Sequence, residues 1–186
     1  MDLLIVTLYS YILGSIPFGL ILTKFAGLGD IRKVGSGNIG ATNVLRTGNK
    51  VIAALTLLLD GLKGTLTVLL TIQYFNELTY YAAVIVFLAH IFPIWLKFKG
   101  GKGVATFIGS LLVINFYLFA VFIAAWLIML SIFRISAVSA LLGYLVITVT
   151  AFIFFDQKMF LLIFFYFITS IFTHRQNIAS LIKDNF

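Results

Sequence analysis

Two short segments of this chain combine glycine, small polar residues and basic residues in a pattern that suits phosphate binding. The first segment, residues 33–46, reads KVGSGNIGATNVLR and ends at Arg46. Glycine accepts the backbone dihedrals that turn several N–H groups toward one anion, and a guanidinium group can hold a phosphate through two parallel hydrogen bonds. A plain connector rarely needs this density of Gly, Asn and Thr, so we favour an anion site.

The second segment, residues 98–106, reads FKGGKGVAT and leads directly into a stretch that we expect to be helical. A helix N-terminus has unsatisfied N–H groups, and glycines with a nearby lysine make it suitable for phosphate. The run is not a Walker A loop, because Gly103 follows Lys102 where Ser or Thr would be required. Lys97 and Lys99 are also explained as basic anchors at a membrane surface.

A nucleotide-binding pattern within the first segment is misleading. Gly35, Gly37 and Gly40 fit G-x-G-x-x-G, and Asp60 follows about 20 residues later, as in a dinucleotide fold. That fold needs a strand before the motif and a βαβ unit around it. Here the motif lies between two apolar stretches and Asp60 falls inside the second, so we reject this interpretation.

The two histidines are candidates for polar chemistry. His90 lies three residues before Pro93, and its sequence context leaves a substrate contact and a hydrogen-bonded packing role equally open. His174 ends the last apolar stretch, where a helix C-terminus would favour its protonated form. Asn177 follows at i+3 and shares its face if one more helical turn continues. This pair is a candidate ligand set for phosphate or hydroxyl.

Two further polar groups have a structural explanation beside a functional one. Arg134, Ser136 and Ser139 stand together, but the arginine also serves as a topological charge and the serines as small packing residues. Asp60 and Lys63 are spaced i, i+3 inside an apolar stretch. Because a lone charge in a bilayer is costly, we expect them to form a structural ion pair.

The composition requires a membrane to hold these groups. Hydrophobic residues make up 62% of the 186 residues, charged residues 10%, and the mean hydropathy is +1.14. This excludes a soluble enzyme, a DNA-binding domain and a disordered regulator. There is no cysteine, which excludes disulfides and thiolate chemistry. The first apolar stretch lacks a basic leader and a cleavage site, so we interpret it as a span.

Polar punctuation predicts an all-α integral membrane bundle of seven helices in a single domain, 1–186. Residues 104–133 carry no charge but are too long for one crossing, and Asn115 offers the break that makes a short fourth helix. Pro17 should kink the first helix. The expected helices are 3–23, 51–72, 78–96, 104–114, 116–133, 135–155 and 159–173.

The basic residues predict the orientation. With the N-terminus outside and the C-terminus in the cytoplasm, the inner segments hold 11 of the 13 Lys and Arg residues. If residues 104–133 crossed only once, or their first part were re-entrant, the C-terminal tail would lie outside. The eleven are Lys24, Arg32, Lys33, Arg46, Lys50, Lys97, Lys99, Lys102, Arg134, Arg175 and Lys183.

The motifs together closely resemble the bacterial acyl-phosphate:glycerol-3-phosphate acyltransferases, the PlsY family, over the whole chain. The segments that carry the resemblance are GSGNIGATNVLR at 35–46, HIFP at 90–93, FKGGKGVAT at 98–106 and HRQNI at 174–178, with GSIP at 14–17 and LDGLKG at 59–64. One departure concerns the third motif. Family members usually continue it into Gly-x-Glu, whereas here either Asp184 takes that role or the acid is dispensable.

The resemblance implies that a fatty acyl group passes from acyl phosphate to the 1-hydroxyl of sn-glycerol 3-phosphate. The products are lysophosphatidic acid and inorganic phosphate, in the first acylation of phospholipid synthesis. It also implies a multi-pass protein of the bacterial cell membrane whose active site faces the cytoplasm. The partners are the two substrates and membrane lipid, with no nucleic acid and no obligatory protein partner. No cofactor is implied, and no metal, since no acidic or histidine cluster has ligand spacing.

Matching the motifs residue by residue gives the expected site. Acyl phosphate is already activated, so no covalent nucleophile is needed, and cations and N–H groups would offset the repulsion of two phosphate anions. The proton acceptor is either a substrate phosphate oxygen or His174. The expected catalytic residues are Lys102, His174 and Ser36. The expected substrate-binding residues are Arg46, Asn177, Asn38, Thr42, Asn43, Ser139 and His90, with a phosphate-binding loop of Gly100, Gly101 and Gly103.

A membrane transporter for an organic phosphate is the alternative function. Charged residues inside a span and a first helix broken by Gly and Pro would suit it. The lack of an inverted repeat and the placement of the polar groups on one side of the membrane count against it.

Overall fold

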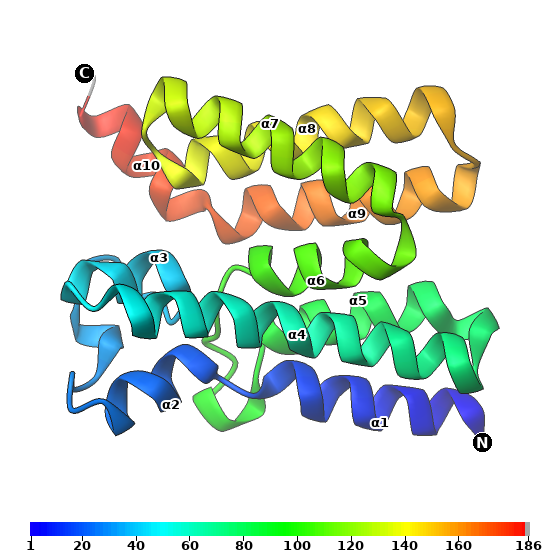
Figure 1. Cartoon of the computed structure of the whole chain (residues 1–186), viewed down its shortest axis with the longest axis horizontal. Coiled ribbons are helices and arrows are strands. Elements are labelled where there is room, and N and C mark those ends of the chain that lie inside the picture. The colour runs from blue at the N-terminus through cyan, green and yellow to red at the C-terminus, as the bar shows by residue number, and fades with distance from the viewer. Residues whose placement is uncertain (185–186) are drawn as a thin grey trace. The chain divides into compact units, whose positions relative to one another are not determined.

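The computed structural model describes residues 1–184, and these are helical with no strand among them. Figure 1 shows the helices in chain order. The α-helices are α1 (Asp2–Ser15), α2 (Phe18–Phe25), α3 (Ala41–Val44), α4 (Lys50–Tyr74), α5 (Thr79–Ile91), α6 (Val104–Ile114), α7 (Phe116–Phe133), α8 (Ser136–Phe154), α9 (Gln157–Thr173) and α10 (Arg175–Asp184). The short 3-10 turns are η1 (Ile31–Lys33), η2 (Leu45–Thr47), η3 (Asn76–Leu78) and η4 (Ile94–Leu96).

The helices agree with a polytopic membrane protein. Five segments are long and apolar enough to cross a bilayer, and α9 with α10, bent by 52°, would make a sixth. The helix α6 is apolar but has only 11 residues, so it is the short fourth helix that the sequence predicts. Asn115 ends it and caps α7, accepting a hydrogen bond from the Leu118 N–H at 2.9 Å. Each of the seven expected segments contains helix, while the count of seven membrane crossings stays a prediction.

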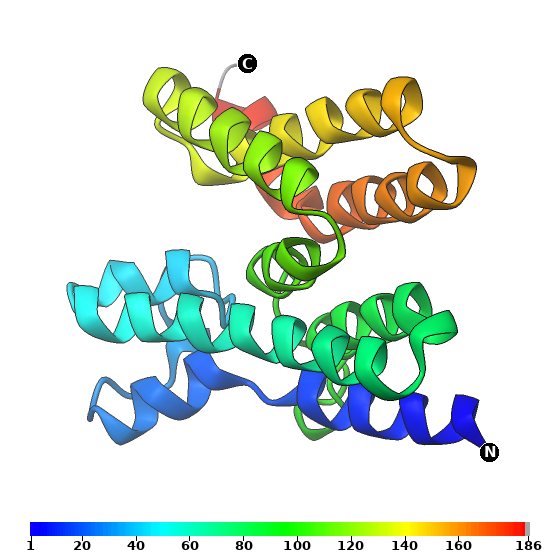
Figure 2. The same ribbon diagram turned by 45° about the vertical axis from the view of Figure 1, so that its right-hand side comes forward.

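The described residues form two compact units, which divide after Ile114. In the first unit α1 packs along α5, and α4 packs against both α5 and α6 (Figures 1 and 2). The first helix is broken as predicted, with α1 ending at Ser15 and α2 beginning at Phe18, on either side of Pro17.

Close contacts in the first unit depend on glycine. A Cβ added to Gly64 of α4 would lie 2.2 Å from the Thr106 carbonyl oxygen, and one added to Gly109 of α6 would lie 1.9 Å from the Gly61 carbonyl oxygen. The Thr65 hydroxyl donates to the Gly109 carbonyl at 2.9 Å. Small residues therefore let the α4 and α6 backbones approach each other, as in many membrane helix pairs.

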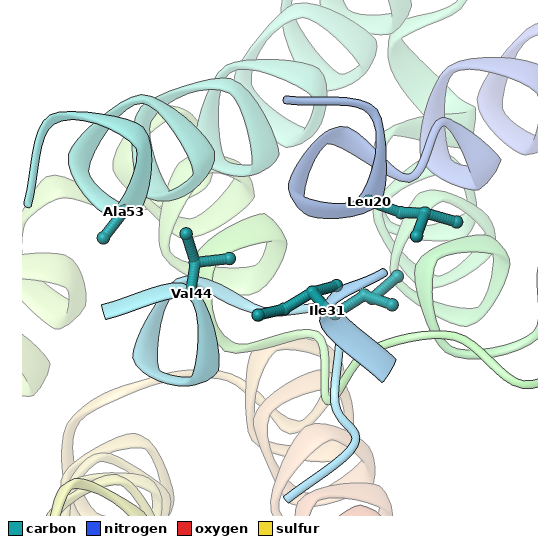
Figure 3. Packing of buried hydrophobic residues seen from close by; sticks show 5 residues of the cluster. Leu20, Ile31, Val44 and Ala53 are labelled. Carbon is teal, nitrogen blue, oxygen red and sulfur yellow. The ribbon is translucent and has the colours of Figure 1, made fainter. Parts of the chain in front are cut away.

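A small apolar cluster fastens the first glycine-rich loop to the helices beneath it. Leu20 of α2 and Ala53 of α4 pack with Ile31 of η1 and with Ile39 and Val44 of the loop, all at most 6% exposed (Figure 3). Because the loop side chains and the helix side chains are buried against each other, the loop is packed onto the helices and is not a loose connector.

The second unit contains α7, α8, α9 and α10. The helix α8 packs against both α7 and α9, and α10 contacts α9. Phe122 of α7 and Tyr144 of α8 contact each other edge to face, with their ring centroids 5.1 Å apart, and both side chains are fully buried. Asp156 caps α9 by accepting from the Met159 N–H at 2.8 Å.

Candidate functional site

Asn43 organises the first loop from inside. Its side chain is 3% exposed, and its Nδ2 lies 3.1, 2.9 and 2.8 Å from the carbonyl oxygens of Ile31, Val34 and Asn38. Its Oδ1 accepts from the Ser36 N–H at 3.1 Å. The amide thus holds the loop backbone in place, so the structure gives Asn43 a scaffolding role where the sequence analysis expected a substrate contact.

The same loop carries Arg46 over Gly35. Gly35 has φ +51°, and a Cβ there would lie 2.5 Å from Arg46 Nη1 and 2.6 Å from Arg46 Cδ. Only glycine accepts both this backbone conformation and this contact. Arg46, Ser36 and Thr42 are exposed, while Asn38 is half-buried and accepts from the Gly40 N–H at 2.9 Å.

The second loop folds back onto the end of α5. The Gly100 N–H donates to the Ile91 carbonyl at 2.9 Å and the Gly101 N–H to the His90 carbonyl at 3.1 Å. These two N–H groups therefore have carbonyl partners in the fold, and their expected contact with phosphate stays a prediction. A Cβ at Gly100 would meet the His90 carbonyl oxygen at 2.1 Å, so close packing explains the glycine.

The N-terminus of α6 still directs N–H groups toward the second loop. Gly103 has φ +85°, and its carbonyl accepts from the Phe107 N–H at 2.8 Å, which closes the first turn. The N–H groups at the start of a helix have no partner within the helix and carry partial positive charge. They stand directly after Lys102 in the chain.

The two loops bring their basic residues near each other. Lys102 is half-buried, and its pKa is lowered from 10.5 to about 8, first by burial and then by the positive charge of Arg46. Two cations that repel each other this way are stabilised by an anion placed between them. The sequence predicted both residues, and the structure brings them together in the first unit.

Behind the second loop lies a buried polar cluster. Lys63 Nζ lies 3.0 Å from Asp60 Oδ1, 2.8 Å from His90 Nδ1 and 2.9 Å from the Ile16 carbonyl oxygen. The three side chains are at most 4% exposed. The predicted ion pair is confirmed. For His90 the structure shows the hydrogen-bonded packing role, and its expected contact with substrate stays a prediction.

In the second unit, His174 stands at the bend between α9 and α10. It is 2% exposed, and its Nδ1 lies 2.9 Å from the Ser170 carbonyl oxygen. A carbonyl only accepts, so Nδ1 carries a proton and Nε2 holds the lone pair of the neutral ring. The Ile178 N–H donates to the His174 carbonyl at 3.0 Å. The helical turn thus continues, as the pairing with Asn177 requires.

The remaining candidates of the second unit are placed less directly for binding. Ser139 is fully buried in α8, and its hydroxyl donates to the Ile135 carbonyl at 2.9 Å, which makes it a packing residue. Arg134 is exposed, has φ +54° and ends α7. The side chain of Asp184, the proposed substitute for the missing glutamate, lies outside the described residues.

Sequence reasoning missed the long-range partners of these groups. The contacts of Lys63 join residues 27 and 47 positions apart, and no periodicity encodes such pairs. The only signal was the cost of a charge inside a span, which predicts a partner without naming all of them. The four bonds of Asn43 were equally hidden, since a Gly- and Asn-rich loop predicts turns but not their mutual arrangement.

Apolar helices long enough to span a bilayer, two glycine-rich loops and neighbouring cations define an integral membrane protein with a candidate anion site. The glycerol-3-phosphate acyltransferase family model matches residues 4–184. The chain is 47% identical over 180 residues to the glycerol-3-phosphate acyltransferase of Mesorhizobium japonicum, covering 97% of this chain and 92% of the relative. It is 51% identical over 180 residues to that of Agrobacterium fabrum, covering 96% and 88%.

Solved structures give the same result. A crystal structure of PlsY (YgiH), an integral membrane glycerol 3-phosphate acyltransferase, in its glycerol 3-phosphate form has a TM-score of 0.92 and 29% identity. The alignment covers 99% of this chain and 94% of that one. The lysophosphatidic acid form has a TM-score of 0.90 and 28% identity, with 99% and 93% covered. This chain belongs to the glycerol-3-phosphate acyltransferase family, which confirms the predicted family and disfavours the transporter.

Proposed function

We propose that this enzyme uses acyl phosphate as its donor and acylates the 1-hydroxyl of sn-glycerol 3-phosphate. The products are lysophosphatidic acid and inorganic phosphate, in the first acylation of phospholipid synthesis. The observation that carries the proposal is the approach of Arg46 to the half-buried Lys102, whose pKa is lowered to about 8 first by burial and then by the arginine charge. A phosphate bound there would offset the repulsion between the two cations.

The chemistry follows from charge. Both substrates carry phosphate, so they repel each other before the hydroxyl can reach the acyl carbonyl. Arg46, Lys102 and the first N–H groups of α6 offset that repulsion and hold the reactants together. The hydroxyl oxygen then bonds to the acyl carbon, and the bond from that carbon to the phosphate oxygen breaks. Because phosphate is a good leaving group, no covalent enzyme intermediate is needed.

The hydroxyl proton needs an acceptor. A phosphate oxygen of a substrate can take it, since the second pKa of a phosphate monoester is near 6. His174 is the rival, because its Nδ1 is held by the Ser170 carbonyl and its Nε2 can exchange a proton. A His174→Gln enzyme that keeps near-normal kcat would eliminate the histidine as the base.

The donor is tested with purified protein and two acyl donors. Glycerol 3-phosphate is supplied with palmitoyl phosphate or with palmitoyl-CoA, and lysophosphatidic acid and free phosphate are measured. We expect product from palmitoyl phosphate alone, and its loss in Lys102→Ala. Equal product from palmitoyl-CoA would refute the donor assignment while leaving the family's acceptor chemistry intact. Thr148→Val, a buried polar change in α8, is the matched control.

The placement in the cell is part of the same proposal. The protein is an integral membrane protein, and we place both glycine-rich loops and the C-terminal helix on the cytoplasmic side of the bacterial membrane. The support is the bias of the basic residues, which collect in the loops that this orientation puts inside. A water-soluble acceptor and a lipid-tailed donor would meet at this interface.

A further inference from the structure

The buried cluster of Asp60, Lys63 and His90 takes no direct part in the proposed reaction. It lies in the first unit, where α4 and α5 supply the three side chains. Burying a charged side chain within a membrane protein costs free energy. Such residues are therefore rare, usually paired and often functional. The contacts of the cluster indicate what that purpose is.

Lys63 has three polar partners. Its Nζ is within hydrogen-bond distance of His90 Nδ1 at 2.8 Å and of the Ile16 carbonyl oxygen at 2.9 Å, and it forms an ion pair with Asp60 Oδ1 at 3.0 Å. Ile16 lies in the break between α1 and α2 that Pro17 creates. Lys63 therefore joins the broken first helix to α4 and α5 at one point.

The bond from Lys63 fixes the orientation of the His90 ring. We assign the ring proton to Nε2, because an ammonium group at Lys63 offers Nδ1 only donors. The Nε2 edge faces Gly101 of the second loop. A Cβ added to Gly101 would lie 2.0 Å from His90 Nε2 and 2.8 Å from His90 Cε1. The Gly101 N–H also donates to the His90 carbonyl. The loop thus rests on both the backbone and the ring of His90.

We propose that His90, held by Lys63, is a positioning residue. It fixes the position of the second-loop backbone relative to the end of α5, and so places Lys102, the next residue after Gly101. This inference rests on the proposed function, because it assigns Lys102 to the reacting phosphate. The ring edge acts as a stop against which the loop backbone lies. Asp60 balances the charge of Lys63 and so keeps it in place.

The test is a pair of substitutions that should compensate each other. The Gly101 backbone is not in the left-handed region, and the three atoms nearest to a methyl group there all belong to the His90 ring. Gly101→Ala should therefore displace the loop and lower kcat/KM for glycerol 3-phosphate about 100-fold, the cost of moving a catalytic group by about 1 Å. His90→Asn removes Nε2 and Cε1 but keeps an acceptor for Lys63 at the Nδ1 position. The double variant His90→Asn/Gly101→Ala should recover to within about tenfold of the parent.

Two controls separate positioning from general disruption. Gly100→Ala meets the backbone carbonyl of His90 at 2.1 Å, so His90→Asn should not rescue it. His90→Gln carries its amide out to the Nε2 position and leaves the clash, so it should not rescue Gly101→Ala. Melting temperatures are measured for every variant, and kinetics are run well below them. A purely structural role would lower the melting temperature while leaving KM of the folded enzyme unchanged.

The outcomes are decisive in both directions. Recovery in the double variant, with a restored KM for glycerol 3-phosphate, supports the positioning role. A Gly101→Ala enzyme with parental KM and kcat would overturn it, as would a double variant no better than Gly101→Ala alone. If the parent enzyme fails with acyl phosphate, the donor proposal fails separately. In that case the affinity for glycerol 3-phosphate is measured by calorimetry, which needs no acyl donor. The parent, single and double variants are then compared by their Kd in place of KM.

Discussion

The side chain of Lys102 changes its charge closer to neutral pH than an ordinary lysine does. Burial and the nearby Arg46 bring its pKa to about 8. If the charged form serves the reaction, kcat/KM should fall as pH rises through about 8. The same shift has the opposite effect on stability. Between about 8 and 10.5 the unfolded chain binds this proton more tightly, so the free energy of unfolding rises with pH.

The Arg46 contribution to that pKa can be isolated. In Arg46→Gln one positive charge is removed while burial, the larger cause, remains. We expect lower activity overall, with the midpoint of the alkaline limb moved to higher pH. Profiles of kcat/KM between pH 6.5 and 10 report the free enzyme and measure this directly. An unchanged midpoint would mean that another group controls the limb.

Asn43 is the residue on which the first loop depends most. In Asn43→Asp the Oδ1 bond to Ser36 survives, but the second oxygen faces three carbonyl oxygens in place of the Nδ2 donor. A buried charge without donors should cost about 3 kcal/mol of unfolding free energy. It should also raise KM for glycerol 3-phosphate. Denaturation in mild detergent and steady-state kinetics measure the two effects.

The exposed neighbour Leu45 provides the comparison for Asn43. Its side chain is 50% exposed, and we expect Leu45→Ala to change stability by no more than about 0.5 kcal/mol. If Asn43→Asp behaved like this control, the loop would be held by its apolar cluster alone. The four bonds of the asparagine would then contribute nothing measurable.

At the scale of elements, the packing of α4 against α6 helps to fix the position of the second loop, because α6 begins where this loop ends. Gly64→Ala and Gly109→Ala place a methyl group against backbone carbonyls at 2.2 and 1.9 Å. Backbone cannot move aside as a flexible side chain would. We therefore expect each change to cost about 1–3 kcal/mol of stability and to reduce activity. Thermal unfolding of the purified variants measures the cost.

Gly61 is the matched position for this test. It lies in the same helix as Gly64, but a Cβ there would be 3.6 Å from its nearest neighbour, the Ala105 carbonyl oxygen. Gly61→Ala should be neutral or raise stability by up to about 1 kcal/mol, because alanine favours a helix. Equal losses at Gly61 and Gly64 would show that helix flexibility, and not close packing, is what these glycines provide.

Elements were predictable where one property along the chain decides them. Apolar length and polar interruptions predicted where the long helices lie, Pro17 predicted the break in the first helix, and Asn115 predicted the start of α7. The site was predictable only as residue types in motifs. The backbone partners of Gly100 and Gly101, which are Ile91 and His90, were not predictable because the loop folds back onto α5 and composition does not encode that contact.

At the scale of the whole molecule, the sidedness of the membrane protein follows from the number of crossings. The helix α6 has 11 residues, about 16 Å at 1.5 Å per residue, which is short for a hydrocarbon core of about 30 Å. If it crosses in spite of this, the C-terminal helix lies inside with the basic loops. If it is re-entrant, every segment after it changes side, so the positions of the charges would contradict the charge rule.

Single cysteines can decide this directly, because the chain has none of its own. We expect cysteines at the exposed positions Glu77, Phe116 and Gln157 to react with an impermeant maleimide on intact cells, and those at Lys33 and Ser180 to react only after permeabilisation. Lys33 and Glu77 come before α6, so they are internal controls whose behaviour does not depend on it. Labelling of Ser180 on intact cells, with protection of Phe116 and Gln157, would show that α6 does not cross. The cytoplasmic placement of His174 and Asn177 would then have to be abandoned, while that of Arg46 and Lys102 would stand.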